Sequence, residues 1–570
     1  SRTLHCKGCD NQCLVVRYRF DNGHEYFSGN RCEKVFANSG GDRPQKGINA
    51  YEKKNRLLFD RDPVKGRAAI TIGIPRCLNM YEDYPFWHIL FTNCGIGVRL
   101  SSNSEFSNYE QSACMVMSDN ICFPAKLAHS HIQDLIDSRV DRIFMPFVVY
   151  ERQDGGQNSY NCPIVTGYAE VIKSVQGGGV PIDSPTISFK DRKLLYWQCC
   201  EYLATLGISD KTASRAFSLA VSAQDAYAKD IAAYDEYVLR KAKERGAMTI
   251  MLAGRPYHAD MLIQHKVSDI LADMGVYVLT DDIVRGRKVA VDDTHYLPQW
   301  AYPNRILEAA EWSAGQEGVE FVEMTSFGCG PDAFLTDEVR DMLMRHGKAL
   351  TLLKLDDINN VGSMKLRVRS LMESLKLAGS GAKGEKKDVE FKTTQEFDDA
   401  CRGRKIIVPF FTPFISPLIP AIMRVAGYDV DNLPLSDTES CEWGLKYANN
   451  EVCYPATLIV GDIIKAFKSG RYNPAKTAVA MTQTGGQCRA SSYVQLIKKA
   501  LVDAGYADVP VVAFTFGGSM GNRQPGFRVN WMKMLPIALY AVLYSDCISK
   551  FYYASAVREK QPGQAARLRD

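Results

Sequence analysis

The chain has 570 residues, 46% of them hydrophobic and 24% charged, the balance of a globular protein with room for about three or four domains. Its formal net charge is only +4 and no block of five or six like charges occurs, which argues against a charge-driven nucleic-acid binder. The most apolar stretch, Met534–Tyr544, is too short to span a bilayer and predicts a buried helix. The N-terminus has no secretory signal, so we expect a cytoplasmic protein without a membrane span.

The first structural element predicted in the chain is a small cysteine module. Cys6, Cys9 and Cys13 share one loop, and a hairpin predicted over residues 14–28 returns Cys32 to it. Three crowded cysteines and one distant cysteine favour a [4Fe–4S] cluster, and the arrangement resembles the module at the start of molybdopterin oxidoreductases. A structural zinc site also takes four cysteines and is the alternative.

An internal repeat surrounds two Cys-x-Pro sites. Residues 120–127 (NICFPAKL) and 451–458 (EVCYPATL) have cysteine, an aromatic residue, proline, alanine and leucine in the same order. Cys122 is followed 40 residues later by Cys162, and Cys453 is followed 35 residues later by Cys488. This match predicts a duplicated α/β domain.

Each Cys-x-Pro site predicts a thiol at a helix N-terminus. Proline is favoured in the first turn of a helix, and the helix dipole there favours the thiolate, which is the form that binds metal. A lone cysteine more often packs as a small hydrophobe, which is the alternative for each site. Two copies with matching downstream cysteines favour metal ligands.

The region between the two repeats predicts another α/β domain. Apolar strand cores at residues 247–254 and 318–324 each run into a turn, and the second turn, Ser326–Asp332, holds Cys329 between two glycines. Open α/β sheets bind ligands at such strand ends, and the glycines would let the backbone approach a bulky cluster. A plain strand-to-helix turn with an incidental cysteine is the alternative.

We therefore expect an α/β protein with several flavodoxin-like or Rossmann-like parallel-sheet domains. The predicted organisation is a four-cysteine iron–sulfur module over residues 1–66, an α/β domain with bridging helices over 67–245, an α/β domain with Cys329 over 246–378, a linker over 379–400, most mobile at Gly379–Asp388, and a repeat of the first α/β domain over 401–570.

Several of these motifs, in order, resemble one protein family. Ile72–Trp87, the Cys122 helix, Asn161-Cys162-Pro163 and Ser326–Asp332 are similar to the large 2-hydroxyacyl-CoA dehydratase-like, acyl-CoA dehydratase activase-related proteins. Benzoyl-CoA reductases and double-cubane cluster proteins are relatives of that family. The resemblance runs from about Cys6 to Ala565.

The resemblance implies a set of cluster ligands and a partner. Cys122, Cys162 and Cys329 would hold one [4Fe–4S] cubane, and Cys453 and Cys488 would begin a second set. In double-cubane members two cubanes share a sulfide, giving [8Fe–9S]. An ATP-hydrolysing activator, as a domain or a subunit, would drive electrons into these clusters for ATP-coupled reductive chemistry.

The chain also departs from the family pattern. The second cysteine set lacks a third ligand, which another chain, Cys441 or Cys547 would have to supply. The family's ATPase domains do not precede Cys6, no P-loop occurs, and the sequence starts without Met, so we expect a piece of a longer protein. The remaining cysteines are expected to pack in the core: Cys77, Cys94, Cys114, Cys199, Cys200 and Cys401.

Three functions remain open from the sequence. The chain is a low-potential reductase or 2-hydroxyacyl-CoA dehydratase-like enzyme, an electron relay for a partner, or a non-catalytic assembly subunit with structural zinc. Polar groups near the sulfurs would tune a cluster, and the candidates are Lys126, His129, His131 and Arg489, although a surface or helix-capping role is favoured for each. No substrate and no catalytic residue can be named, because a CoA thioester follows from the relatives alone.

Overall fold

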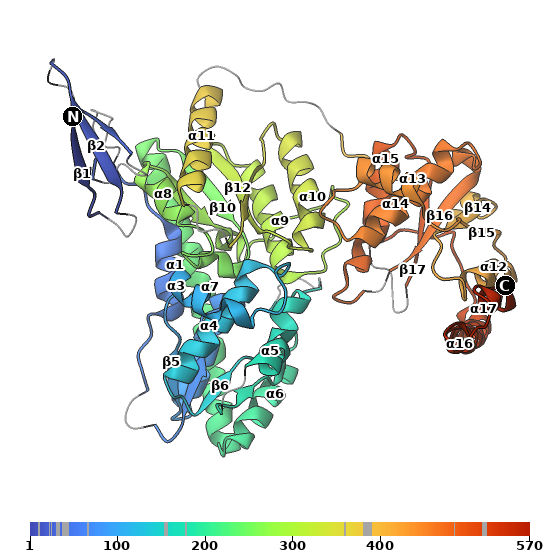
Figure 1. The fold of residues 1–570 in the computed structure, drawn as a ribbon, viewed down its shortest axis with the longest axis horizontal. Coiled ribbons are helices and arrows are strands. Elements are labelled where there is room, and N and C mark those ends of the chain that lie inside the picture. The colour runs from blue at the N-terminus through green and yellow to red at the C-terminus, as the bar shows by residue number, and fades with distance from the viewer. Residues whose placement is uncertain are drawn as a thin grey trace.

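The structure is a computed structural model that describes residues 1–8, 12–21, 23, 25–29, 35–36, 45–64, 68–152, 158–176, 179–357, 361–379, 390–483, 485–515 and 521–570. Within these residues it contains three four-stranded parallel sheets flanked by helices, a two-stranded parallel sheet, and one antiparallel sheet at the N-terminus (Figure 1). The predicted α/β fold class is therefore confirmed.

The N-terminal sheet is small and lies apart from the α/β body (Figure 1). It pairs β1 (Arg2–His5), β2 (Leu14–Arg19) and β3 (Glu25–Ser28) in antiparallel order, and β2 and β3 form the predicted hairpin. Its core contains the thiols of Cys6 and Cys13 packed with Val15.

The first α/β unit is built on the sheet β5-β4-β6-β8. The strands are β4 (Thr71–Ile74), β5 (Gly97–Leu100), β6 (Arg142–Phe144) and β8 (Ile182–Asp183), and a pair formed by β7 (Phe147–Tyr150) and β9 (Thr186–Ser188) lies beside it. Its helices are α2 (Met80–Asn93), α3 (Phe106–Ser112), α4 (Phe123–Asp137), α5 (Pro163–Val175) and α6 (Arg192–Thr205), with η1 (Ala113–Met115) between α3 and α4.

A long helix joins the first unit to the second. Helix α7 (Asp210–Arg245) begins at Ser209, whose side chain accepts from Thr212 N, and ends at Gly246, whose left-handed φ of 57° suits glycine. It packs on α2 of the first unit and on α1 (Ala50–Phe59) and β11 (Tyr277–Thr280) of the second. Helix α1, within residues 1–66, packs on α7 and β11.

The second α/β unit is built on the sheet β11-β10-β12-β13. The other strands are β10 (Thr249–Ala253), β12 (Val319–Ser326) and β13 (Thr351–Leu355), and all pairings are parallel. Helices α8 (Val267–Asp273), α9 (Ala301–Ala314), α10 (Asp332–Arg345) and α11 (Val361–Gly379) surround the sheet, with short turns η2 (Pro256–Ala259) and η3 (Asp281–Val284).

The third α/β unit repeats the plan of the first. Its sheet β15-β14-β16-β17 consists of β14 (Lys405–Val408), β15 (Val430–Asn432), β16 (Thr477–Thr482) and β17 (Val511–Phe514). In both units the sheet order is second, first, third, fourth, and a Cys-x-Pro helix follows the second strand, as the predicted duplication requires. The helices are α12 (Ile419–Val425), α13 (Thr438–Tyr447), α14 (Tyr454–Lys468) and α15 (Tyr493–Asp503), with turns η4 (Asp399–Cys401), η5 (Ser416–Leu418), η6 (Pro474–Lys476) and η7 (Arg489–Ser492). Most of the expected mobile segment, Gly379–Asp388, lies outside the described residues.

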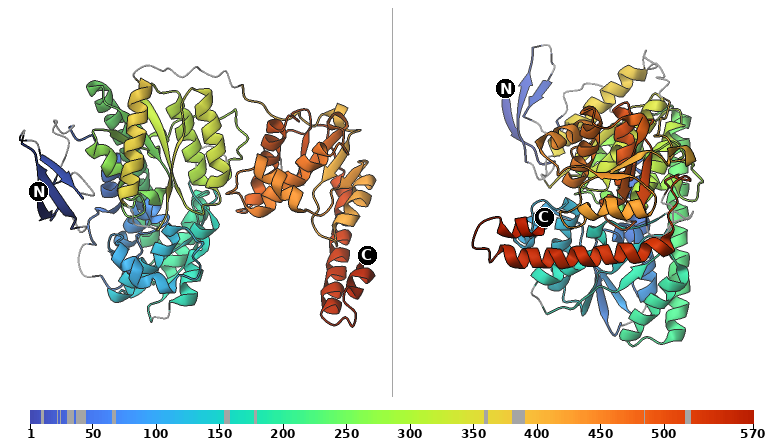
Figure 2. Two further views of the ribbon diagram at one scale, coloured as in Figure 1. Left: turned by 45° about the horizontal axis from the view of Figure 1, so that its top comes forward. Right: turned by 90° about the vertical axis from the view of Figure 1, so that its right-hand side faces the viewer.

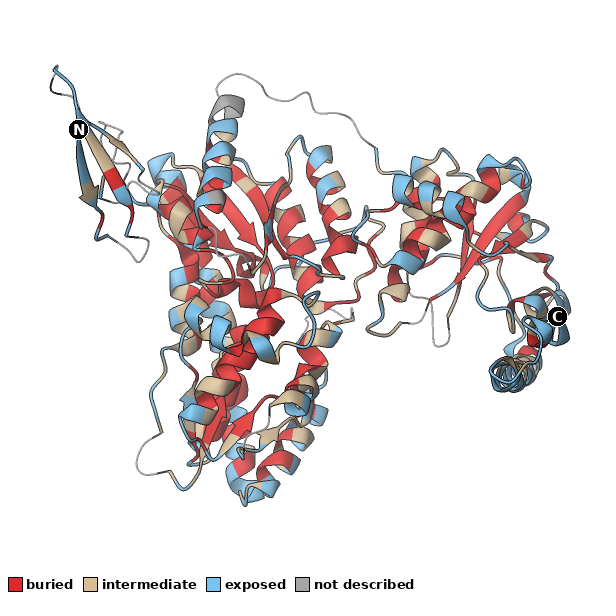
Figure 3. Cartoon of the chain, viewed as in Figure 1, coloured by how far each residue is buried: buried red, intermediate tan, exposed pale blue. Residues whose placement is uncertain are grey.

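The expectation of a short buried helix at Met534–Tyr544 is wrong. Helix α16 (Trp531–Ala556) has 26 residues and projects from the third unit beside α17 (Gln564–Arg569), and its side chains are largely exposed (Figures 2 and 3). Within the described chain it is the one helix long and apolar enough to cross a membrane, by length and composition alone. The hydrophobic composition of a segment does not determine whether its apolar side chains are buried within the same chain.

Candidate functional site

Four of the predicted ligand cysteines lie at the starts of helical turns. Cys122, Cys162 and Cys453 are the N-cap residues of α4, α5 and α14, each followed by proline in the first turn, and Cys488 is the N-cap of η7. The helix-start positions predicted for Cys122 and Cys453 are confirmed. All four residues have extended backbone dihedrals, and the thiol of Cys162 caps α5 by accepting from the backbone N–H of Val165 at 3.4 Å.

Two of these cysteines lie in the first unit, and the turn that holds a further predicted ligand, Cys329, approaches them from the second unit. Cys122 and Cys162 project from the first sheet, and Cys329 lies in the turn between β12 and α10 of the second. That turn needs glycine at Gly328, where φ is +77° and an added Cβ would lie 3.4 Å from the carbonyl oxygen of Asn120. Asn120 directly precedes the Cys122 segment, so the two loops are in contact.

Burial and a charge on Cys162 act in the same direction on the pKa values of Cys122 and Cys329. Burial and, to a smaller degree, the charge on Cys162 raise the pKa of Cys122 to about 12. Burial also raises the pKa of Cys329 well above its ordinary value, and Cys162 acts in the same direction. Neutral thiols this close to one another form a metal site only if a cationic centre replaces their protons.

One arginine that the sequence analysis did not select faces this group. Arg255 follows β10, is 2% exposed, and its Nη2 donates to Cys329 Sγ at 3.6 Å. Its Nε donates to Asp332 Oδ1 at 3.0 Å, which forms a fully buried ion pair at the start of α10. The available signal was Gly254-Arg255-Pro256 directly after a strand core, at the edge where open sheets bind ligands.

The second cysteine group is centred on Tyr493. Its hydroxyl lies 2.8 Å from Cys453 Sγ, and its pKa is raised by burial, by that hydrogen bond and by charges on Cys453 and Cys488. Of the two substitutes named for the missing ligand, Cys441 on α13 hydrogen-bonds the side chain of Tyr454, the residue after Cys453. Cys547 is exposed on α16.

The two cysteine groups face one another across the contact between the third unit and the other two. Gln487 Nε2 donates to the carbonyl oxygen of Asn161 at 3.0 Å, so the residues preceding Cys488 and Cys162 are joined directly. The guanidinium group of Arg489 covers Gly330, where an added Cβ would lie 2.6 Å from Nη1. These contacts join the two cysteine loops.

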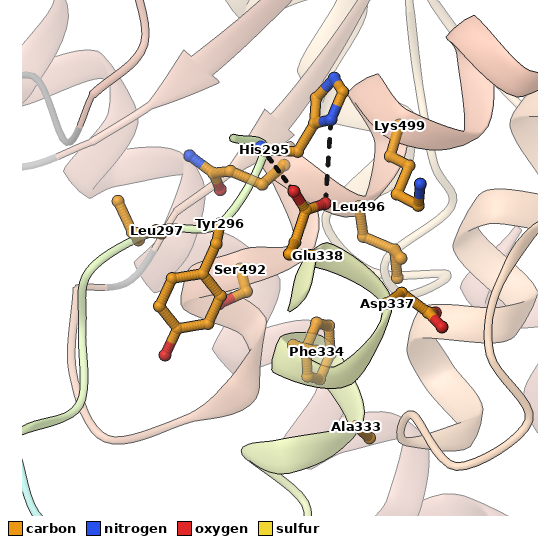
Figure 4. Close-up of a pocket in the computed structure, with 11 residues that line it drawn as sticks. His295, Tyr296, Leu297, Ala333, Phe334, Asp337, Glu338, Ser492, Leu496 and Lys499 are labelled. Atoms are coloured by element: carbon orange, nitrogen blue, oxygen red, sulfur yellow. Dashed lines mark hydrogen bonds and ion pairs between the residues drawn. The ribbon is translucent and has the colours of Figure 1, made fainter. Parts of the chain in front are cut away.

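A shallow cleft lies further along the same contact, between α10 and α15 (Figure 4). His295 Nδ1 lies 3.8 Å from Glu338 Oε1, and the backbone N–H of His295 donates to Glu338 Oε2 at 3.0 Å. Burial and the nearby Lys499 and Lys498 lower the pKa of His295 to about 4, so the imidazole is neutral at physiological pH. The cleft is lined by no cysteine and has little room beyond a water molecule, so it is part of the seam between units.

The surface or capping roles favoured for the three residues on α4 are wrong. Lys126, His129 and His131 are all buried. Lys126 Nζ lies 2.7 Å from Asp357 Oδ2, and the two imidazoles bond to the hydroxyls of Tyr168 and Ser101, respectively. These groups fix α4 within the fold and have partners other than the thiols.

The other predicted cysteine roles have mixed outcomes. Cys77, Cys199 and Cys401 are buried as expected, but Cys114 is exposed, which contradicts the prediction that it packs in the core. In the N-terminal module Cys9 and Cys32 lie outside the described residues. Cys6 N donates to Cys13 O at 2.9 Å, which closes the loop between these two cysteines.

A buried charge cluster holds the first two units in register. Lys54 Nζ of α1 lies 2.7 Å from Asp282 Oδ2 at η3, with side chains 1% and 0% exposed. Arg285 bridges Asp282 Oδ1 and Glu82 Oε1 of α2 at 2.5 and 2.6 Å, and Arg305 adds a second cation beside Glu82. Despite burial, these cations lower the pKa of Asp282 and Glu82. The cluster fixes the relative placement of the sheets that carry Cys162 and Cys329.

One buried carboxyl next to this cluster predicts a pH-dependent stability. Glu151 Oε1 accepts from Asn161 Nδ2 at 2.7 Å, and burial together with the charge on Glu82 raises its pKa to about 7. Between pH 4.5 and about 7 the folded state keeps this proton, whereas the unfolded chain has lost it. The contribution of the protonated carboxyl to the free energy of unfolding is therefore complete below pH 4.5 and is lost as the pH rises to about 7.

Because of Glu151, the free energy of unfolding of the parent protein is expected to fall by about 3 kcal/mol between pH 4.5 and pH 8. In Glu151→Gln this part of the fall should be absent. Urea unfolding at both pH values measures the difference. Glu110→Gln on the exposed side of α3 is the matched control and should leave the pH dependence unchanged. An identical pH profile for Glu151→Gln and the parent protein would contradict this assignment.

One comparison with known protein families found a match, which covers the first unit, helix α7 and the start of the second unit. Residues 71–284, from β4 to η3, match a family model described as a CoA enzyme activase uncharacterised domain. A search of curated proteins found no match. The match spans both helices that begin at Cys122 and Cys162 as well as Arg255, and it covers less than half of the chain.

Proposed function

We propose that this chain is an iron–sulfur protein that takes part in low-potential electron transfer within an acyl-CoA dehydratase activation system. The observation that carries the proposal is the convergence of Cys122, Cys162 and Cys329 from two units around one buried guanidinium group. The match to a CoA enzyme activase domain supports the type of system.

A cluster and a single metal ion place different demands on the spacing of their cysteine ligands. Thiolates that share one zinc ion must lie within about 4 Å of each other, because each Zn–S bond is about 2.3 Å. Among the described residues no group of three or more His, Cys, Asp or Glu side chains is close enough to hold one ion. A cubane binds each thiolate at a different iron and so accepts neighbouring thiols that are further apart.

In the proposed site each side chain has a separate task. Cys122, Cys162 and Cys329 would hold a [4Fe–4S] cubane, which supplies one-electron chemistry when bound. Arg255 donates to a ligand sulfur, and Asp332 holds Arg255 in place. Three protein ligands leave one iron open to a small ligand, a bridging sulfide or a substrate.

The second group extends the proposal. Cys453 and Cys488 would ligate a second cubane, for which Cys441 is the nearer of the two candidate third ligands. The contact between Gln487 and Asn161 supports a shared [8Fe–9S] cluster, because a bridging sulfide requires both groups at one interface. The partners would be an ATP-hydrolysing activator and a dehydratase. Cys6, Cys9, Cys13 and Cys32 would hold a further [4Fe–4S] cluster that accepts electrons.

Iron, acid-labile sulfide and zinc determined on anaerobically purified protein test the proposal. We expect iron and sulfide in about equal amounts and an electron paramagnetic resonance signal after reduction. Stoichiometric zinc without iron would instead favour a structural assembly subunit and defeat the proposal. If iron is present, acyl-CoA turnover by the isolated reduced protein distinguishes an enzyme from an electron relay.

A further inference from the structure

We propose that Arg255 and Asp332 set the reduction potential of the cluster held by Cys122, Cys162 and Cys329, and that they act in opposite directions. Both are positioning residues that act through a ligand sulfur. This inference rests on the proposed function, and it assigns to the ion pair a task beyond holding the turn together.

The pair is fixed in place on both sides. Gly254 precedes Arg255, and an added Cβ there would lie 2.5 Å from His258 Nδ1, so the backbone reaches this position only with glycine. The backbone N–H of Arg255 donates to the same His258 nitrogen at 3.1 Å. On the other side, the hydroxyl of Thr325 donates to Asp332 Oδ2 at 2.8 Å.

The guanidinium group serves two acceptors at once. Its Nε donates to Asp332 Oδ1, and its Nη2 also reaches Cys329 Sγ at 3.6 Å. An ion pair that only stabilised the fold would not need the second contact.

The direction of each effect follows from charge. A reduced cluster carries one more negative charge than an oxidised cluster, so a nearby cation and an N–H donor to sulfur stabilise the reduced form. A nearby carboxylate disfavours it. Both side chains are 2% exposed, so water screens these effects little. Arg255 therefore raises the reduction potential and Asp332 lowers it.

Potentiometric titration followed by electron paramagnetic resonance, on the anaerobic full chain, tests the inference. Arg255→Met should lower the ratio of reduced to oxidised cluster at a fixed potential by about tenfold, the effect of losing one hydrogen bond to a charged group. Asp332→Asn should raise the ratio, and the double variant should lie near the parent. Arg255→Lys keeps the charge and should recover part of the loss.

Opposite signs separate this role from a structural one, because general damage to the turn would change both variants in the same direction. Arg142→Met is the matched control, since Arg142 pairs with Asp183 at the start of β6 and bonds no thiol in the described contacts. If Arg255→Met loses its iron, the reduction potentials of Asp332→Asn and Arg255→Lys test the inference instead. Reduction potentials that shift in the same direction in the Arg255 and Asp332 variants, or that do not shift although iron is retained, would overturn the inference. A parent protein without iron would instead defeat the proposed function.

Discussion

Replacement of Cys122 by Ala is expected to remove about four irons per chain from anaerobically purified protein without unfolding it. Cys122 lies at the start of α4, where its side chain contributes a thiol but no cap hydrogen bond. Loss of this ligand opens one corner of the proposed cubane, whereas α4 keeps its proline in the first turn. Iron analysis and circular dichroism on the same sample measure the two effects.

The exposed Cys114 provides the matched control, and Cys114→Ala should retain all iron. Cys453→Ala tests whether the two groups share a cluster. Spectral change at both groups in either variant supports a bridged cluster, whereas loss at one group with an unchanged signal at the other supports two separate clusters. Full retention of iron in Cys122→Ala would refute the ligand assignment.

Replacement of Asp282 by Ala is expected to destabilise the protein by about 3–5 kcal/mol. The substitution leaves the buried Lys54 ammonium, 1% exposed, without its carboxylate partner, and Arg285 with Glu82 alone. The cost is that of an uncompensated buried charge, which exceeds the value of the pair itself. Urea unfolding at pH 7 measures the change.

Two further variants make this prediction specific. Lys54→Met in the Asp282→Ala background removes the stranded charge and should recover part of the lost stability, because a buried pair replaced by apolar groups is often nearly neutral. Glu170→Ala breaks the exposed pair with Lys173 and should cost less than about 1 kcal/mol. If Asp282→Ala costs no more than Glu170→Ala, the buried cluster does not hold the two units together.

Much of the local structure could be predicted from the sequence. The hairpin over residues 14–28, the strand cores of β10 and β12, and the helix starts at Cys122 and Cys453 are as predicted. Each of these depends on rules that act over a few residues, such as period-two alternation, apolar runs and proline in the first turn of a helix. The duplication could also be found, because equal residues recur in equal order.

Other features were decided by the tertiary structure alone. Arg255 meets Cys329 across 74 residues, and Lys126 is buried because Asp357, 231 residues away, pairs with it. The sequence by itself determined which thiols stand at helix starts, since that depends on neighbouring residues. Packing between distant segments decides three other features: the charges that surround those thiols, the burial of the polar groups on α4 and the exposure of α16. No local sequence pattern encodes that packing.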